Sequence, residues 1–93
     1  AKTNFEKPEV YQLAEKIADR IWEIVIKWDH FAKDTAGKQI VRAADSVGAN
    51  IAEGIGRRSH ADNKRFVRTG RGSLYETKHF LRRTFKRNLP GRT

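Results

Sequence analysis

The 93-residue chain contains no cysteine, which excludes disulfide bonds, thiolate metal sites and cysteine nucleophiles. This absence is typical of a protein from a reducing cytoplasm. Long hydrophobic runs are also missing, because apolar stretches such as residues 24–26 fall far short of the ~18 residues that span a bilayer. No charged-then-apolar leader opens the sequence. We therefore expect a soluble, cytoplasmic protein.

Apolar residues are scarce for a chain that must build its own core. They make up 38% of the sequence, against 33% charged residues. Because domains cluster near ~100–150 residues, residues 1–93 are expected to form one small domain. A single copy would bury little apolar surface, and this predicts a homo-oligomer.

Acidic residues are scarce in the second part of the chain. Residues 1–34 contain six Lys and Arg against seven Asp and Glu, whereas residues 35–93 contain fourteen against four. The net charge of +9 therefore resides in the second part. A positive field on one side of a protein attracts polyanions, so this part is the candidate for a binding function.

Alternation typical of β-strands is missing, and apolar residues instead recur at spacings of three and four. A first helix is predicted over residues 8–31, because Pro8 suits a first helical turn. Its apolar line comprises Val10, Leu13, Ile17, Ile21, Ile24, Trp28 and Phe31.

Two further helices are predicted in the remaining sequence. The second covers residues 36–55, with Asp34 or Thr35 as its cap and with Gly54 and Gly56 permitting a left-handed end. Its apolar line comprises Ile40, Ala44, Val47, Ile51 and Ile55. The third covers residues 59–88, opens with a capping box at Ser59 and Asp62, and stops before Pro90-Gly91. Its core line comprises Val67, Gly70, Leu74, Thr77 and Leu81, with Phe66, Phe80 and Phe85 beside it.

Short loops between long helices make neighbouring helices antiparallel. The predicted fold class is therefore all-α, an up-down helical bundle. Several core-facing positions of the second and third helices hold small residues, which let the two helices approach closely. These residues are Ala43, Ala44, Ala52, Gly70 and Ser73.

Motifs for nucleotide binding, metal binding and catalysis are missing. The segment GIGRRS lacks the spacing of a phosphate loop, and GRGS at residues 70–73 lies inside a predicted helix, where backbone N–H groups are already used. The histidines His30, His60 and His79 fall in three different predicted elements, and no i, i+4 ligand pair of the H-E-x-x-H kind occurs. Asp29, Asp34 and Asp62 lie at predicted helix ends, where acids act as caps. We expect no enzymatic activity, no metal and no cofactor.

Two segments carry a resemblance to a known family. RAADSVGANIAEGIGRRS at residues 42–59, followed by RFVRTGRGSLYET at residues 65–77, resembles the bacterial four-helix-bundle family associated with intervening sequences in 23S ribosomal RNA. The likeness extends from Phe5 to about Leu89. The matching positions include Arg42, Asn50, Glu53, Gly54, Gly56, Gly70, Ser73, Leu74 and Glu76.

The resemblance implies an antiparallel bundle that commonly assembles as a homopentameric ring. Related proteins include accessory factors of diversity-generating retroelements, which bind nucleic acid and a reverse transcriptase. Family members usually continue into a fourth helix, whereas this sequence ends in FKRNLPGRT. We therefore expect the fourth helix to be missing or shortened, which leaves an apolar groove along the other three.

Polar motif residues next to the core of the second helix are expected to form hydrogen bonds across the contact with the third helix, or between subunits. Asn50 and Glu53 occupy such positions. Arg42, Glu53 and Glu76 are candidates for ion pairs between helices, and the sequence does not fix the partners.

A row of basic residues is the strongest functional signal. At ~100° per residue, the row lies roughly 110° round the third helix from its core line. With the two arginines of the preceding turn, the predicted nucleic-acid-binding residues are Arg57, Arg58, Lys64, Arg68, Arg71, Tyr75, Lys78, Arg82 and Lys86. The cations suit phosphates, and the tyrosine suits a stacked base.

Three functions remain open for this row. The first is binding of nucleic acid, RNA rather than DNA, through backbone charge. The second is an adaptor function, in which the surface docks an acidic partner such as a reverse transcriptase or a ribosomal component. The third is a solvated face that keeps the protein soluble, although such a face normally alternates the two signs of charge. We predict the first.

Overall fold

A computed structural model describes residues 9–57 and 59–88 and contains helices but no strand in these two ranges. The predicted all-α class is therefore confirmed. Pro8, Arg58 and Pro90-Gly91 lie outside the described residues. The elements, in chain order, are α1 (Glu9–Val25), α2 (His30–Ala32), the π-helical segment η2 (Lys33–Gly37), α3 (Lys38–Ile55) and α4 (His60–Lys86).

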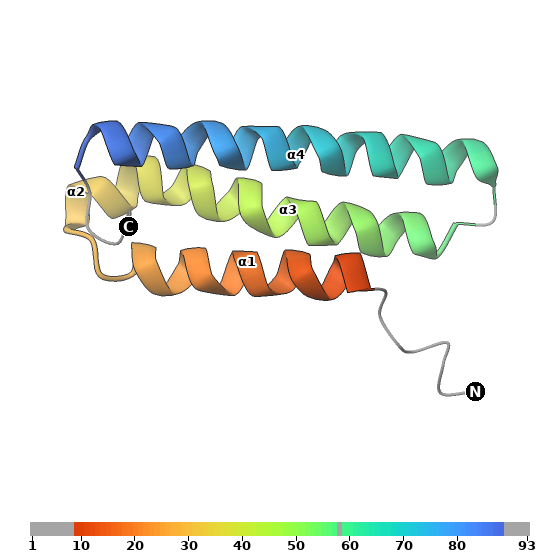
Figure 1. The fold of residues 1–93 in the computed structure, drawn as a ribbon, viewed down its shortest axis with the longest axis horizontal. Coiled ribbons are helices and arrows are strands. Elements are labelled where there is room, and N and C mark those ends of the chain that lie inside the picture. Colours follow the sequence, from red (N-terminus) through yellow and green to blue (C-terminus); the bar gives the residue numbers. More distant parts are fainter. Residues whose placement is uncertain (1–8, 58, 89–93) are drawn as a thin grey trace.

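Helix α3 occupies the middle of the fold. It runs antiparallel to α1 and to α4, and both pack against it (Figure 1). The chain reverses direction after α1 and again after α3, as an up-down order requires (Figure 1). The resulting body measures 44 × 26 × 20 Å, so the three long helices lie side by side along one axis.

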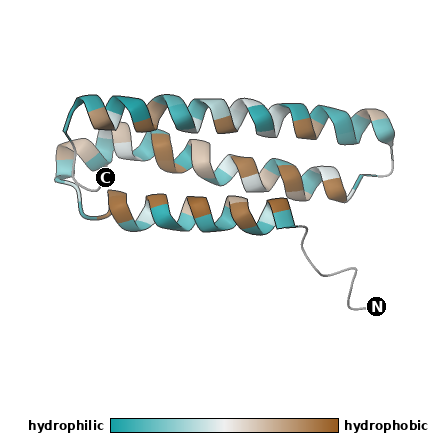
Figure 2. Cartoon of the chain, in the orientation of Figure 1, coloured by the Kyte–Doolittle hydropathy of each residue, from teal (hydrophilic) through white to brown (hydrophobic). Residues whose placement is uncertain are grey.

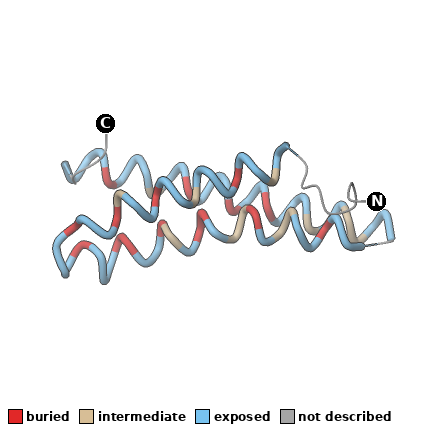
Figure 3. Tube along the Cα trace, turned by 90° about the horizontal axis from the view of Figure 1, so that it is seen from below, coloured by how far each residue is buried: buried red, intermediate tan, exposed pale blue. Residues whose placement is uncertain are grey.

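The core lies at the end of the bundle where α1 ends and α2 begins. Ile21 and Val25 of α1 pack with Trp28 of the following turn and with Ile40 and Ala44 of α3. Buried positions extend along the inner sides of all three long helices, separated by exposed stretches (Figure 3). Most of the large core side chains are therefore concentrated at one end.

The first helix is shorter than predicted, because it ends at Val25 rather than at residue 31. Two backbone hydrogen bonds between residues three apart form the turn. Lys27 N–H donates to the Ile24 carbonyl (3.2 Å), and Trp28 N–H donates to the Val25 carbonyl (2.9 Å). Trp28 is buried within this turn, so it continues the apolar spacing without continuing the helix. Phe31, predicted to face the core, is 76% exposed.

The second helix begins earlier than predicted, at His30 rather than at residue 36. Its cap is Asp29, whose carboxylate accepts a hydrogen bond from Ala32 N–H at 2.9 Å. The two residues predicted as caps lie inside the π-helical segment η2 instead. There, the hydrogen bond from Lys38 lowers the pKa of Asp34, and the Thr35 hydroxyl donates to the Phe31 carbonyl.

Segment η2 brings its last residue close to the end of α1. A Cβ atom added to Gly37 would lie 2.8 Å from Cγ1 of Val25 and 3.3 Å from the Ala32 carbonyl oxygen. Only glycine fits at this distance without movement of its neighbours. The wider π-helical turn and this glycine together allow the start of α3 to pack against the core.

Small and hydroxyl-bearing residues line the contact between α3 and α4. Gly70 is buried close to Asn50 Cβ, and Ser73, Thr77 and Thr84 are buried in the same row. The Thr77 hydroxyl donates to the Ser73 carbonyl at 2.8 Å, so this buried polar atom is satisfied within its own helix. The predicted close approach of the two helices is confirmed, but Ala52, predicted to face the core, is exposed.

The glycines that end α3 act differently from the prediction. Gly54 is buried inside the helix, where an added Cβ would lie 3.2 Å from Cβ of Phe66, so it is a packing residue. Gly56 follows the helix with φ −77°, so no left-handed cap forms there. Asn63 Nδ2 donates to the Gly54 carbonyl at 2.9 Å and joins the two helices. The predicted cap of the next helix is confirmed, because Ser59 Oγ accepts from Asp62 N–H.

The predicted core line of the third helix is wrong for its largest residues. Val67, Leu74 and Leu81 are 54%, 38% and 42% exposed. The closest approach to α3 is formed instead by the small residues described above, with the half-buried Phe66 and Phe80 beside them. Val67, Leu74 and Leu81 lie on a flank of α4 that is about 70° round the helix from these small residues.

We expect Ile40→Ala to lower the free energy of unfolding by about 2–4 kcal/mol, because Ile40 is 1% exposed in the core. Leu74→Ala should cost only about 1 kcal/mol, because this side chain is partly exposed. Urea unfolding followed by circular dichroism measures both values. Equal losses for the two variants would show that Leu74 is part of the core.

The same substitution at two glycines should have opposite effects. Gly37→Ala should destabilise the fold by about 1–3 kcal/mol, because its Cβ would meet Val25. Gly72→Ala should stabilise it by about 0.5–1 kcal/mol, because Gly72 is inside α4 with nothing within 4 Å of an added Cβ. Thermal unfolding curves of the two variants test this. A stabilising Gly37→Ala would contradict the close contact.

Candidate nucleic-acid interface

Helix α4 carries the excess of positive over negative charge in the described structure. Its 27 residues include eight Lys and Arg against two acids, Asp62 and Glu76. Figure 2 shows a predominantly hydrophilic helix with a few separated hydrophobic residues. The net positive charge of α4 therefore makes it the candidate surface for binding an anionic partner.

Six of these cations and one tyrosine form a single row, which we call the basic stripe. All seven side chains are exposed. At 100° per residue they fall within an arc of about 80°, and at 1.5 Å per residue they extend over about 33 Å. The members of the basic stripe are Lys64, Arg68, Arg71, Tyr75, Lys78, Arg82 and Lys86.

The cations of the basic stripe have no carboxylate partners among the residues that the structure describes. The two acids of α4 lie on other sides of the helix. Asp62 belongs to the first turn, where it forms a loose ion pair with Arg65 at 3.8 Å. The positive potential of the basic stripe is therefore not neutralised within the described part of the chain.

A shallow hollow lies at the N-terminal end of the basic stripe. It has a volume of about 240 Å³ and is lined by Asn63, Lys64, Val67, Arg68 and Arg71. Three cations around one hollow are suited to an anionic group such as a phosphate. Tyr75 follows one turn further along and is 61% exposed, so its ring is accessible.

Of the two arginines predicted to bind nucleic acid at the turn before α4, the structure describes Arg57, which contacts neighbouring side chains. Arg57 forms an ion pair with Glu53 at 2.8 Å, and its guanidinium carbon lies 4.8 Å from the centre of the Phe66 ring. Arg65 approaches the same ring at 4.4 Å. Arg57 is thus held by its own helix end, because Glu53 is four residues earlier. Arg58 lies outside the described residues.

The polar motif residues of α3 form fewer links between helices than predicted. Asn50 Nδ2 donates to the Ser46 carbonyl at 2.8 Å, within its own helix, and Glu53 pairs with Arg57. Within the described ranges, no ion pair joins Arg42 to Glu76. A hydrogen bond that does cross this contact comes from Asn63, a residue for which no role was predicted.

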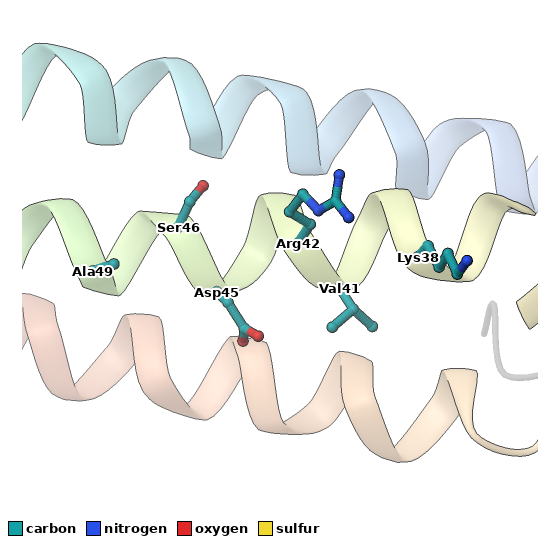
Figure 4. A pocket seen from close by; sticks show the side chains of 6 residues that line it. All are labelled: Lys38, Val41, Arg42, Asp45, Ser46 and Ala49. Atoms are coloured by element: carbon teal, nitrogen blue, oxygen red, sulfur yellow. The ribbon is translucent and has the colours of Figure 1, made fainter. Parts of the chain in front are cut away.

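A second hollow lies on the outer side of α3. Its volume is about 500 Å³, and Figure 4 displays the six residues that line it. Arg42 and Ser46 point toward α4, whereas Asp45 points toward α1 (Figure 4). Because these polar side chains point in opposite directions, they do not gather around one point in the hollow.

No group of three or more His, Cys, Asp or Glu side chains in residues 9–57 and 59–88 could hold a metal ion. His60 and His79 both belong to α4, contrary to the prediction of separate elements. They are about 28 Å apart along the helix axis. None of the helices in the same ranges is long and apolar enough to cross a membrane.

The fold and its charge define a small all-α protein in which a central helix carries two neighbours and one outer helix bears a basic stripe. Comparison with family models identifies it further: residues 6–91 match the model described as 23S rRNA-intervening sequence protein, and the chain belongs to this family. The resemblance carried by the motifs at residues 42–59 and 65–77 is thereby confirmed. A search of curated proteins found no match.

Proposed function

We propose that the protein binds nucleic acid through the basic stripe of α4 in a non-catalytic role. The observation that supports this most strongly is the row of six exposed cations with no carboxylate partner among the described residues. A face that only keeps a protein soluble mixes both signs of charge, whereas the charged residues of the basic stripe are all cations.

RNA is the first nucleic acid to test, because the description of the family refers to 23S rRNA. The stripe is straight and about 33 Å long, so its cations can contact successive phosphates of one strand. Phosphate contacts position a nucleic acid without reading its sequence, and the proposed binding is therefore sequence-independent. Tyr75 supplies a ring for stacking in the middle of the stripe.

Removal of four stripe cations should weaken RNA binding regardless of sequence. The variant is R68Q/R71Q/K78Q/R82Q, and the probes are two labelled single-stranded RNAs of unrelated sequence. Each lost phosphate contact should lower the slope of log K against log salt by about 0.7, because fewer counterions are released. Fluorescence anisotropy over a range of KCl concentrations measures affinity and slope. The helical circular dichroism signal should not change, since these residues are exposed.

A matched control separates contact from net charge. It removes four exposed cations that lie outside α4, in the variant K16Q/R20Q/K27Q/K33Q. We expect this control to retain most of the affinity and the full salt slope. Equal losses of RNA affinity in the two variants would show that the basic stripe is not the contact surface. If the stripe variant retains wild-type affinity, the stripe only keeps the protein soluble.

Tyr75→Ala should weaken RNA binding on the order of tenfold, whereas Tyr75→Phe should retain wild-type affinity, because stacking requires the ring and not the hydroxyl. Since Tyr75 carries no charge, the salt slope should be the same in both variants. Anisotropy titrations measure both quantities. If Tyr75→Ala binds RNA as tightly as the wild type, the contact is made by charge alone.

A further inference from the structure

A third hollow lies between α3 and α4 at the end of the bundle that holds the core. Its volume is about 520 Å³, and segment η2, the first turns of α3 and the last turns of α4 contribute to its lining. Three arginines line it: Arg42 of α3, Arg83 in the last turn of α4, and Arg87 directly after that helix. Arg42 points toward α4 (Figure 4). We call this feature the cationic hollow.

The three arginines of the cationic hollow have no carboxylate partner among the residues that the structure describes. Asp34 is the one carboxylate in the lining, and Lys38 neutralises it at 3.0 Å. Glu76 is outside the lining and lies about 10 Å from Arg83 along the helix axis. The positive charge of the three guanidinium groups is therefore not compensated within the described part of the chain.

Stabilisation of a helix end accounts for only part of this cluster. Cations near the C-terminus of a helix offset the negative end of its dipole, which explains Arg83 and Arg87. Arg42 belongs to the neighbouring helix, so the dipole of α4 does not account for it. Arg83 and Arg87 also repel each other, because like charges four residues apart in a helix are neighbours. An anion bound among the three arginines would remove this repulsion.

The concentration of charge favours a phosphate monoester over a phosphodiester. A phosphate monoester carries nearly two negative charges at neutral pH and three terminal oxygens, whereas each phosphodiester of a nucleic-acid backbone carries one charge. Planar guanidinium groups match phosphate oxygens in paired hydrogen bonds. The basic stripe spreads its cations over about 33 Å, whereas the cationic hollow gathers three arginines around one space.

The cationic hollow is larger than a phosphate group alone requires. Its volume of about 520 Å³ lies within the range of small-molecule sites, ~300–1,000 Å³. Besides the cations, the half-buried ring of Phe80 and the buried Ala36 supply apolar lining. The exposed side chains of Thr35 and Gln39 supply polar atoms. A sugar or base attached to the phosphate therefore has both apolar and polar partners.

The position of the cationic hollow keeps it separate from the other surfaces of α4. An apolar groove between α1, α3 and α4 lies on one flank of the contact between α3 and α4, where Val67 lines it. At 100° per residue, Phe80, Arg83 and Arg87 lie on the opposite flank. A further helix packed on the apolar groove would therefore leave the cationic hollow open. The nearest members of the basic stripe are about 60° round α4 from Arg83.

We propose that the cationic hollow binds the phosphate monoester of a nucleotide, either free in solution or at the 5′ end of an RNA. Arg42, Arg83 and Arg87 hold the phosphate, and Phe80 contacts the attached sugar or base. Lys86 of the basic stripe is one turn from Arg83, so a strand whose end is held in the hollow can continue along the stripe. Only the RNA form of the ligand rests on the proposed nucleic-acid binding.

The first experiment uses no RNA. Its probe is adenosine 5′-monophosphate with fluorescein on the base, and its control is the same labelled adenosine without the phosphate. By anisotropy at low salt, the monophosphate should bind at least about tenfold more tightly. The variant R42Q/R83Q should lose this preference. The matched control R20Q/R65Q removes two exposed arginines outside the hollow and should keep it.

The second experiment distinguishes the two sources of the monoester. Two RNAs of one sequence, labelled at the 3′ end, carry either a 5′-phosphate or a 5′-hydroxyl group. If the RNA end is the ligand, the 5′-phosphate RNA should bind about fivefold more tightly to the wild type and equally to R42Q/R83Q. The stripe variant R68Q/R71Q/K78Q/R82Q should weaken binding of both RNAs and keep their ratio. Equal binding of the two RNAs, with the monophosphate still preferred over adenosine, assigns the site to a free nucleotide.

Two results would overturn the proposal. The first is equal affinity for the monophosphate and for adenosine in the wild type. The second is a preference that persists in R42Q/R83Q and disappears in the stripe variant, because the basic stripe would then hold the phosphate. All substituted arginines are exposed, so the helical circular dichroism signal should be retained. Arg87→Gln alone, which should weaken binding of the monophosphate severalfold, keeps the test decisive if R42Q/R83Q does not fold.

Discussion

The close contact between α3 and α4 is the constraint on which the rest of the structure depends. Gly54 and Gly70 remove the side chains that would hold the helices apart, and Ser73 and Thr77 fill the remaining space. Small residues occupy the closest approach, with the half-buried Phe66 and Phe80 beside them. Val67, Leu74 and Leu81 occupy the adjoining flank, where Val67 and Leu74 line an apolar groove between α1, α3 and α4.

Helix α4 therefore carries three different surfaces on adjoining parts of its circumference. The seam with α3, the apolar flank and the basic stripe follow one another round the helix, each repeating at three or four residues. Arg71 stands at the boundary of the last two, since it lines both the groove and the hollow of the stripe.

Several local features were predictable because they depend on neighbours in sequence. The cap at Ser59 and the end of α3 near residue 55 follow from short-range chemistry, and both are found. The exposure of the basic stripe follows from helical spacing once the helix is identified. The break after Val25 was not predictable from spacing, because Trp28 keeps the apolar period while the backbone turns. The signal that marks it is Asp29, which caps the next helix.

The sequence by itself determined the all-α class, the three long helices and the position of the charge, because helix periodicity, capping and net charge are local or additive properties. Only the tertiary structure decided which flank of each helix is buried. Val67, Leu74 and Leu81 have the apolar spacing of a core line, yet they remain partly exposed. The distance between α3 and α4 selects small residues for the seam, and that distance is a property of two helices together that neither sequence segment specifies alone.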